Sequence, residues 1–394
     1  MTIKPMNEEK QRIAYISSAA YADVDISLLN ALQKYADVTY YICLGPGGLR
    51  QTAIDLSRNR DLKDGIIPAL DIPELKQFEM LVDLSKMYVY YNSGKHSYSL
   101  TSIKNGIKLY KHLKAGSFNV YHFTSPLTYS QFPLYRFRSR SILTVHDPFP
   151  HSSMNNRNVR IIRYISFKLF KHFILLNKAQ RAQFLNTYHI KKNNVYDSSL
   201  SCYTFLKAYA KDTNPNGDYI LFFGNISSYK GIEYLCESMI MVHDVYPNCK
   251  VIIAGNGKYY FDINEYENKD YFDFRNRFIP TEELATLIKH AKIVVVPYVD
   301  ATQSGVVMSA YAFTKPCIVT NVGGLPEMVG GGELGVIVEP RDINALGNAI
   351  IDCLSNAETL LKYSEKIQKA YGEGEQSWDA IAKRLITFYS KLYH

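Results

Sequence analysis

Short runs of β-branched and aromatic residues alternate with amphipathic stretches along the first half of the chain. Such runs indicate buried strands, and apolar residues spaced three or four apart indicate helices that pack on one face. The run RIAYIS at 12–17 precedes a predicted helix at 25–35, in which Ile26, Leu29 and Leu32 share one face. Further strands are predicted at 38–44, 118–123, 141–146 and 173–177. This alternation is typical of a doubly wound α/β domain.

The alternation restarts after a polar, turn-rich segment at 210–217, which we interpret as a linker. Strands are then predicted at 219–224 and 250–255 and from residue 293, with helices at 231–242 and 282–290. The last amphipathic stretch, 377–393, predicts a final helix with Ser377 as its N-cap. Two α/β halves in one chain predict a two-lobed protein with a ligand cleft.

Charge and cysteine content narrow the classes of partner and compartment. The 394 residues suffice for two domains, and the net charge of +8 favours nucleotides, acidic glycans or an anionic membrane surface as partners. We expect no nucleic-acid partner, because no helix-turn-helix, zinc-finger or RNA-binding signature occurs. The six cysteines are scattered without a C-x-x-C pair, which favours free thiols in a reducing compartment. With no apolar signal core and no apolar run of about 18 residues, we expect a cytoplasmic protein.

The most informative segment runs from 293 to 342. There a buried strand ends before Ser304 and Gly305, which open a helix, and the GGLPE loop at 323–327 follows the next strand. Free backbone N–H groups at a helix N-terminus favour an anion, and glycines let the backbone approach a ligand. Two such loops at the carboxyl edge of a parallel sheet predict a phosphate-bearing ligand.

This segment resembles the donor half of family-4 retaining glycosyltransferases, which have the two-domain GT-B fold. The matching residues are Pro297, Ala310, Ala312, Lys315–Pro316, Gly323 to Glu327 and Gly335 to Asp342. The two glutamates of the family motif fall on Ala301 and Ser309, so both carboxylates are missing. The run Thr302 to Gly305 resembles the T-Q-S-G version of some subgroups.

The resemblance implies a donor site around Lys230. The run from Gly224 to Gly231 resembles the G-R-x…K-G signature, with Asn225 at the arginine position, and Lys230 would neutralise a leaving diphosphate. The alternative is a surface lysine in a turn. The loop at 277–280 would hold the nucleotide base. At the helix that Ser304 and Gly305 open, the alternative to a phosphate site is plain capping by Thr302 or Ser304. Glu327 would accept from a sugar or ribose hydroxyl or cap the following turn. The implied donor-binding set is Gly224, Asn225, Lys230, Gly255, Gly257, Arg277, Ile279, Gln303, Ser304, Gly305, Val306, Ser309 and Glu327.

In the first half, SILTVHDP at 141–148 resembles the family's T-x-H-D element. It makes His146 a catalytic candidate, in contact with the sugar or the acceptor, unless it is a buried core histidine. Asp147 is an acceptor-side candidate or a structural brace of the loop, and His151 is a weaker acceptor-side candidate.

Two further patterns have competing interpretations. Asp23-Val24-Asp25 looks like a metal-binding D-x-D, but Asp25 is more simply an N-cap, and the resemblance implies no metal and no other cofactor. Basic residues interleave with apolar ones at 157–171, which suits either an anionic membrane surface or a solvated helix face.

We therefore expect a GT-B protein with two Rossmann-like, doubly wound α/β domains facing a cleft. The acceptor-side domain would be 1–208 with 376–394, the last helix crossing back to it, and the donor domain would be 209–375. It would be a hexosyltransferase-type enzyme of polysaccharide biosynthesis, cytoplasmic or peripheral on the inner face of the membrane. It would move a sugar from a nucleoside-diphosphate sugar, UDP by family frequency, to a glycan or lipid-linked hydroxyl with retention. The alternatives are a non-catalytic GT-B subunit and a nucleotide-sugar epimerase; no G-x-G-x-x-G supports a dehydrogenase.

Overall fold

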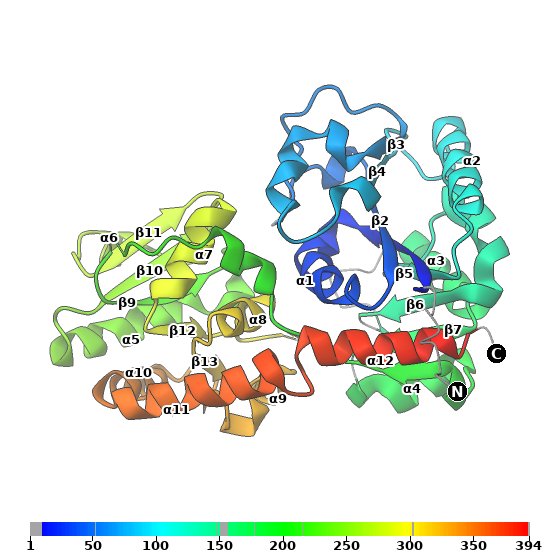
Figure 1. Ribbon diagram of the computed structural model, residues 1–394. Helices are drawn as coiled ribbons and strands as arrows, with labels where there is room; N and C mark the ends of the chain where they lie inside the picture. Colours follow the sequence, from blue (N-terminus) through cyan, green and yellow to red (C-terminus); the bar gives the residue numbers. More distant parts are fainter. Residues whose placement is uncertain are drawn as a thin grey trace, which may run out of the picture. The chain divides into compact units, whose positions relative to one another are not determined.

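The chain divides into two compact units (Figure 1). Unit 1 comprises Met1–Leu200 with Trp378–His394, and unit 2 comprises Ser201–Ser377. The computed structural model describes residues 10–51, 53–146, 148–149, 157–176, 178–214, 216–301 and 303–392.

Unit 1 is built on an eight-stranded sheet in the order β3-β4-β2-β1-β5-β6-β7-β8. All its neighbouring strands are parallel except the edge pair β3 and β4. The strands are β1 (Arg12–Ser18), β2 (Asp37–Leu44), β3 (Gly65–Pro68), β4 (Met87–Tyr91), β5 (Val120–Phe123), β6 (Ser141–Val145), β7 (His172–Leu175) and β8 (Val195–Asp197). The five strands predicted in this half correspond to β1, β2, β5, β6 and β7, with ends that differ by at most two residues.

The helices of unit 1 include α1 (Ala22–Leu32), α2 (Leu100–Ala115), α3 (Arg157–Leu169), α4 (Arg181–Tyr188) and α12 (Trp378–Ser390). Aromatic side chains dominate one core cluster, among them Phe123, Phe173 and Phe184. Each such side chain contributes about 1.5–3 kcal/mol by leaving water. As expected, the last helix returns to this unit: Tyr35, just after α1, donates from its hydroxyl to Asp379 of α12 at 2.6 Å.

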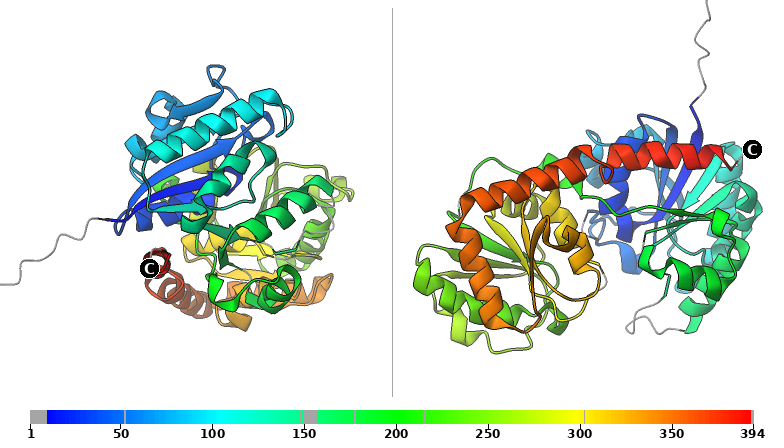
Figure 2. Two further views of the ribbon diagram at one scale, coloured as in Figure 1. Left: turned by 90° about the vertical axis from the view of Figure 1, so that its right-hand side faces the viewer. Right: turned by 90° about the horizontal axis from the view of Figure 1, so that it is seen from below.

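Unit 2 is built on a six-stranded, fully parallel sheet in the order β11-β10-β9-β12-β13-β14. Its strands are β9 (Tyr219–Phe223), β10 (Lys250–Gly255), β11 (Phe272–Asn276), β12 (Ile293–Val296), β13 (Cys317–Thr320) and β14 (Gly335–Val338). The central strands are fully buried, because helices cover both faces of the sheet (Figure 2). The helices are α5 (Ile232–Val245), α6 (Asn264–Glu267), α7 (Thr281–His290), α8 (Gly305–Ala312), α9 (Leu325–Met328), α10 (Ile343–Ser355) and α11 (Ala357–Ile367).

The division between the units lies before the expected linker. Residues 201–208, expected in the first domain, belong to unit 2. The reason is local packing: the Tyr203 N–H donates to the Met308 carbonyl of α8 at 3.2 Å, and the short 3-10 segment Thr204–Tyr209 packs on α7 and α8. The fold class itself is as predicted, two doubly wound α/β units.

Candidate functional site

Four loops lie side by side at the carboxyl edge of the unit 2 sheet. They follow β10, β9, β12 and β13, which are adjacent and parallel. Backbone hydrogen bonds tie the first three together: the Ile226 N–H donates to the Asn256 carbonyl at 3.0 Å, and the Val299 N–H donates to the Tyr229 carbonyl at 2.9 Å. This edge carries most of the predicted donor residues, as expected for a ligand site of an open α/β sheet.

Two glycines allow the backbones of these loops to meet. Gly231 has a φ of +63°, and a Cβ there would lie 2.0 Å from the Pro297 carbonyl oxygen at the end of β12. A Cβ on Gly255 would lie 1.8 Å from the Gly224 carbonyl oxygen. Only glycine fits at either position, so the turn that carries Lys230 is held directly against the end of β12.

Lys230 is a half-buried cation with no counter-charge. Its ammonium lies 3.7 Å from the ring centre of Tyr298 and 4.9 Å from that of Tyr229. Within the described part of the chain it makes no hydrogen bond and no ion pair. Burial lowers the pKa of this ammonium from 10.5 to about 8, so it is still protonated at pH 7. Aromatic faces stabilise the charge without neutralising it, which leaves it able to bind an anion.

The start of α8 is the second candidate anion-binding element. Ser304 occupies the N-cap position and is buried, but its side chain makes no cap bond. The hydroxyl instead donates to the Tyr298 hydroxyl at 3.4 Å. The alternative prediction, a plain cap by Ser304, is therefore wrong, and the hydroxyl leaves the first-turn N–H groups of α8 available. Thr302 lies outside the described residues.

Other predicted donor residues already form hydrogen bonds or ion pairs within the protein. The Arg277 guanidinium donates twice to Glu283, at 2.8 and 2.6 Å, and this pair lowers the pKa of Glu283. The Arg277 N–H donates to the Gly255 carbonyl at 2.9 Å, which places the 277–280 loop beside the Gly255 loop. Ser309 is buried, and its hydroxyl donates to the Gly305 carbonyl at 2.8 Å. The hydroxyl proton is therefore committed to the backbone, and a neutral hydroxyl stands where the family motif has a carboxylate.

The remaining predicted donor residues lie around this edge, and Gly257 among them is held by two hydrogen bonds with the Asn276 side chain, at 3.2 and 3.1 Å. Gln303 and Glu327 are exposed, at the approach to α8 and on α9. Val306 is packed beside Gly224, since a Cβ on that glycine would lie 3.6 Å from its methyl. The other members, Asn225, Gly257 and Ile279, lie in the loops after β9, β10 and β11.

His146 follows β6 in unit 1. Its ring stacks on Tyr21 with 4.0 Å between the centroids and 2° between the planes. Burial lowers the pKa of His146 to about 4, so the imidazole is neutral at pH 7. Its Nε2 is buried and makes no hydrogen bond within the described residues. The two neighbouring acceptor-side candidates, Asp147 and His151, lie outside those residues.

The structure corrects the interpretation of Asp25. Helix α1 begins at Ala22, so Asp25 lies inside the helix and is not its N-cap. The buried carboxylate accepts from the hydroxyls of Tyr15 and Tyr40 at 2.8 and 3.1 Å, and burial raises its pKa to about 7. In the described part of the chain, no group of three His, Cys, Asp or Glu side chains could hold a metal ion.

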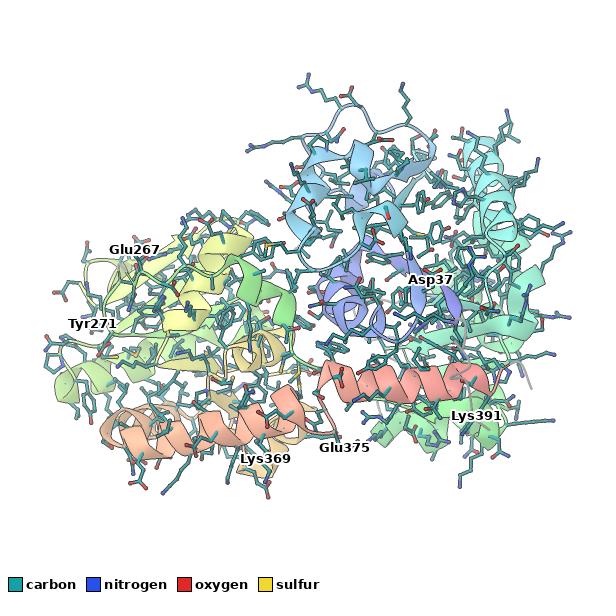
Figure 3. All side chains as sticks on the ribbon, viewed as in Figure 1. Asp37, Glu267, Tyr271, Lys369, Glu375 and Lys391 are labelled. Carbon is teal, nitrogen blue, oxygen red and sulfur yellow. The ribbon has the colours of Figure 1, made fainter. Side chains whose placement is uncertain are left out.

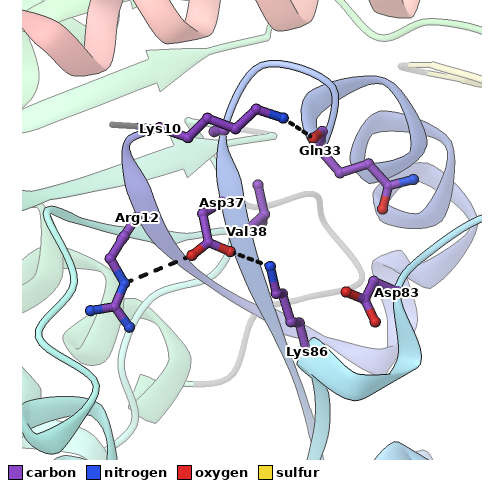
Figure 4. A pocket seen from close by; sticks show the side chains of 8 residues that line it. Lys10, Arg12, Gln33, Asp37, Val38, Asp83 and Lys86 are labelled. Atoms are coloured by element: carbon purple, nitrogen blue, oxygen red, sulfur yellow. Dashed lines mark hydrogen bonds and ion pairs between the residues drawn. The ribbon is translucent and has the colours of Figure 1, made fainter. Parts of the chain in front are cut away.

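A hollow of about 670 Å³ at the amino ends of β1 and β2 is a less suitable site (Figure 4). Its charged side chains are partly paired, because Asp37 contacts Arg12 at 3.8 Å and Lys86 at 2.7 Å (Figure 4). Figure 3 labels Asp37 among the side chains of the whole chain. In parallel α/β sheets ligands bind at the opposite, carboxyl edge. We therefore assign this hollow to surface ion pairs.

Sequence reasoning missed the aromatic side chains of the donor site. Tyr298 underlies Lys230, and the Tyr203 hydroxyl would lie 3.0 Å from a Cβ added at Gly305. The only available signal for Tyr298 was its place directly after a buried strand. No sequence pattern indicated Tyr203, because it lies at the start of unit 2, about 100 residues before α8, and contacts that helix only in the folded chain.

Comparison with known proteins agrees with this geometry. Residues 217–356 match the family model described as "Glycosyl transferases group 1". An uncharacterized glycosyltransferase of Methanocaldococcus jannaschii is 30% identical over 181 residues, which cover 43% of this chain and 44% of that protein. The alignment thus spans less than half the length of this relative.

Two solved structures match nearly the whole chain. Sucrose-phosphate synthase from Thermosynechococcus elongatus aligns with a TM-score of 0.64 at 18% identity and covers 98% of this chain and 99% of its own. The Anabaena protein HepE, solved in complex with UDP, aligns with a TM-score of 0.62 at 14% identity and covers 97% and 100%. The chain therefore has the two-domain GT-B fold, and residues 217–356 of it are similar to the glycosyl transferases group 1 family.

Proposed function

We propose that this protein is a hexosyltransferase-type glycosyltransferase. It transfers a sugar from a nucleoside-diphosphate sugar to a hydroxyl of a glycan or lipid-linked acceptor, with retention of the anomeric configuration. The observation that carries the proposal is Lys230, a protonated ammonium held without a counter-charge where the loops of adjacent parallel strands converge. A desolvated cation at this place suits a diphosphate better than a neutral ligand.

The proposed mechanism is electrostatic stabilisation of the leaving group. As the bond from the sugar to the diphosphate breaks, negative charge grows on the diphosphate oxygens, and Lys230 and the first-turn N–H groups of α8 stabilise it. Both are in place before the reaction, so little reorganisation is needed. The acceptor hydroxyl then attacks the oxocarbenium-like sugar from the face that the diphosphate leaves, and its proton passes to an oxygen of the departing diphosphate. His146, neutral at pH 7, contacts the sugar or the acceptor and hydrogen-bonds through its buried Nε2.

Holding the donor's hydroxyls requires other groups than the family glutamates. Ala301 has no polar side chain, and the Ser309 hydroxyl is bonded to the backbone. We assign this role to Gln303 and Glu327, which are exposed beside the same edge. UDP is the proposed nucleotide, supported by the fold shared with HepE, which was solved with UDP. The proposed reaction needs no metal.

A peripheral membrane location is proposed through α3. No helix in the described residues is long and apolar enough to cross a bilayer. Helix α3 exposes Val159, Ile161 and Tyr164 together with the cations Arg160 and Lys168. A basic helix with exposed apolar side chains suits an anionic leaflet. Sedimentation with vesicles tests this: the double substitution R160E/K168E should abolish binding to phosphatidylglycerol-containing vesicles, and unchanged binding would remove α3 from the proposal.

Nucleotide binding is the first test of the donor site. Thermal unfolding is compared with UDP, GDP, ADP and TDP for wild type, Lys230→Ala and the control Lys250→Ala, an exposed lysine at the amino end of β10. A nucleotide at about 100 times its dissociation constant adds roughly 2.7 kcal/mol to the free energy of unfolding. We expect a shift with UDP in wild type and control that is lost in Lys230→Ala. No shift with any nucleotide would favour the non-catalytic subunit.

Analysis of the reaction products distinguishes the proposed glycosyltransferase from the alternative, a nucleotide-sugar epimerase, since both would bind a UDP-sugar. Incubation with UDP-sugars and no acceptor would yield an epimer if the protein were an epimerase. A transferase would give slow release of UDP, accelerated by the correct acceptor, with the new glycosidic bond in the configuration of the donor. An inverted bond would refute same-face attack.

A further inference from the structure

Unit 1 contains a pocket at the carboxyl ends of β4, β2, β1 and β5, neighbouring strands of its sheet. Its volume is about 360 Å³, and small-molecule sites usually measure about 300–1,000 Å³. The pocket is thus large enough for one end of a saccharide. None of the predicted site residues lines it, although Ala19 and Ala20 of its wall precede Tyr21, on which His146 stacks.

The lining is polar but carries no fixed charge. Among the described residues it contains no Lys, Arg, Asp, Glu or His; the hydrogen-bonding side chains are hydroxyls and amides, apart from the thiol of Cys43. They are Ser18, Gln51, Tyr90, Asn92, Ser97, Ser125, Thr128, Ser130 and Gln131. The loop Gly45–Gly48 adds backbone that lacks bulky side chains. A site of this composition matches a ligand with many hydroxyl groups and no charge.

Tyr90 supplies an unused polar group to this lining. The side chain is 3% exposed, and its hydroxyl makes no hydrogen bond of ordinary geometry within the described residues, although Ser130 interacts with it. A buried hydroxyl without a partner costs about 1–3 kcal/mol, so a ligand that bonds to it recovers free energy. Burial, Cys43 and Asp64 all raise the pKa of Tyr90. The field of Asp64 also disfavours an anionic ligand beside this hydroxyl.

Several lining groups are fixed in advance by the surrounding residues. Asn92 accepts from the Asn105 amide at 3.2 Å and donates to the Ser102 hydroxyl at 3.0 Å. Gln131 accepts from the Thr128 N–H at 3.0 Å and completes a capping box. Ligand binding therefore requires little ordering of these side chains, which favours affinity.

We propose that this pocket binds an uncharged saccharide, with the Tyr90 hydroxyl bonded to one of its hydroxyl groups. If the protein is a glycosyltransferase as proposed above, the ligand is the neutral sugar end of the acceptor. The assignment as acceptor rests on that function, whereas the binding of a neutral saccharide does not.

Saturation-transfer NMR on the full chain tests the binding. The probes are the methyl glycosides of glucose, galactose, mannose and N-acetylglucosamine, compared with methyl glucuronide and glucose 1-phosphate. The variants are Tyr90→Phe and the control Tyr88→Phe, on the same strand but outside the pocket lining. Tyr90→Phe removes a hydroxyl without an ordinary hydrogen bond, so the fold is expected to remain intact.

We expect transfer to at least one neutral glycoside and none to methyl glucuronide; transfer to glucose 1-phosphate would arise from the proposed donor site and should be lost in Lys230→Ala. Tyr90→Phe should weaken the binding of the neutral glycoside about three- to tenfold, the effect of one hydrogen bond, and Tyr88→Phe and Lys230→Ala should leave it unchanged. A preference for methyl glucuronide, no binding of any neutral glycoside, or equal binding by Tyr90→Phe would overturn the proposal. Since Lys230→Ala abolishes only nucleotide binding, failure of this pocket and failure of the donor site give different results.

Discussion

Replacing Lys230 by methionine should stabilise the ligand-free protein while abolishing nucleotide binding. Burial lowers the pKa of the ammonium from 10.5 to about 8, and each pKa unit corresponds to about 1.4 kcal/mol. Keeping Lys230 protonated at pH 7 therefore costs the folded state at most about 3.5 kcal/mol. The contacts with Tyr298 and Tyr229 offset about 0.5–2 kcal/mol of this. Methionine retains the apolar stem over the rings, so we expect a net gain of about 1–2 kcal/mol.

The assay is thermal unfolding of wild type, Lys230→Met and the control Lys250→Met over a range of pH. For a domain of 150–250 residues, 1 kcal/mol shifts the midpoint by about 2–4 °C. The folded state binds fewer protons than the unfolded state between pH 8 and 10.5, because the pKa of Lys230 is lower when folded. The stability of wild type relative to Lys230→Met should thus rise through this interval, and the advantage of the variant should shrink.

The reasoning would be refuted if Lys230→Met were less stable than wild type at pH 7, or if the difference between them did not change with pH. Either result would mean that a counter-charge already neutralises the ammonium. In that case the lysine would be a structural element of the loop and would not be kept charged for a ligand.

Three further outcomes follow from the structure. Gly231→Ala should lower the free energy of unfolding of unit 2 by about 1–3 kcal/mol or more, because the φ of Gly231 is +63° and an added Cβ would clash with the Pro297 carbonyl. Thermal unfolding measures this, with Gly47→Ala as the control, since an added Cβ at Gly47 has no atom within 4 Å. Asp25 has a pKa of about 7 in the folded protein, so it binds a proton more readily there than in the unfolded chain. The free energy of unfolding, measured by urea titration, should therefore fall as pH rises from about 4 to 7, and Asp25→Asn should reduce this pH dependence. Addition of EDTA should leave UDP affinity, measured by calorimetry, unchanged, and a loss would show that a metal holds the diphosphate.

The strands of unit 2 could be predicted closely because their physical signal is unambiguous. Strands buried on both faces consist almost entirely of apolar residues, and the runs predicted at 219–224 and 250–255 end within one residue of β9 and β10. The strands of unit 1 could be predicted less completely. The edge strands β3 and β8 and the strand β4 beside β3 were not predicted. Helix α1 begins three residues before the predicted start because a 3-10 turn at Ala19–Tyr21 leads into it. Because the helix start was predicted three residues too late, Asp25 was interpreted as an N-cap, although it lies inside α1 and is buried and hydrogen-bonded.

The site residues depend on tertiary packing that local patterns do not encode. The sequence placed Lys230 at a loop between strand and helix, but not over the ring of Tyr298, which follows β12 and lies 68 residues further along the chain. It also could not distinguish a ligand-facing Ser309 from one bonded to the Gly305 carbonyl, because that depends on which side of α8 faces the core. Resemblance to a family pointed to one sheet edge, whereas burial and hydrogen bonding depend on the tertiary structure of that edge.

The two units offer ligands opposite kinds of chemistry, and this division bears on the missing glutamates. A carboxylate near Lys230 would pair with the ammonium and weaken its hold on a diphosphate, unless the sugar hydroxyls occupied that carboxylate. With Ala301 and Ser309 in those positions, the cation is left uncompensated by the described residues. The pocket of unit 1, in contrast, carries no fixed charge in its described lining. Under the proposed function, a charged donor would be recognised mainly through its diphosphate and a neutral acceptor through its hydroxyl groups, so each substrate would be disfavoured in the site of the other.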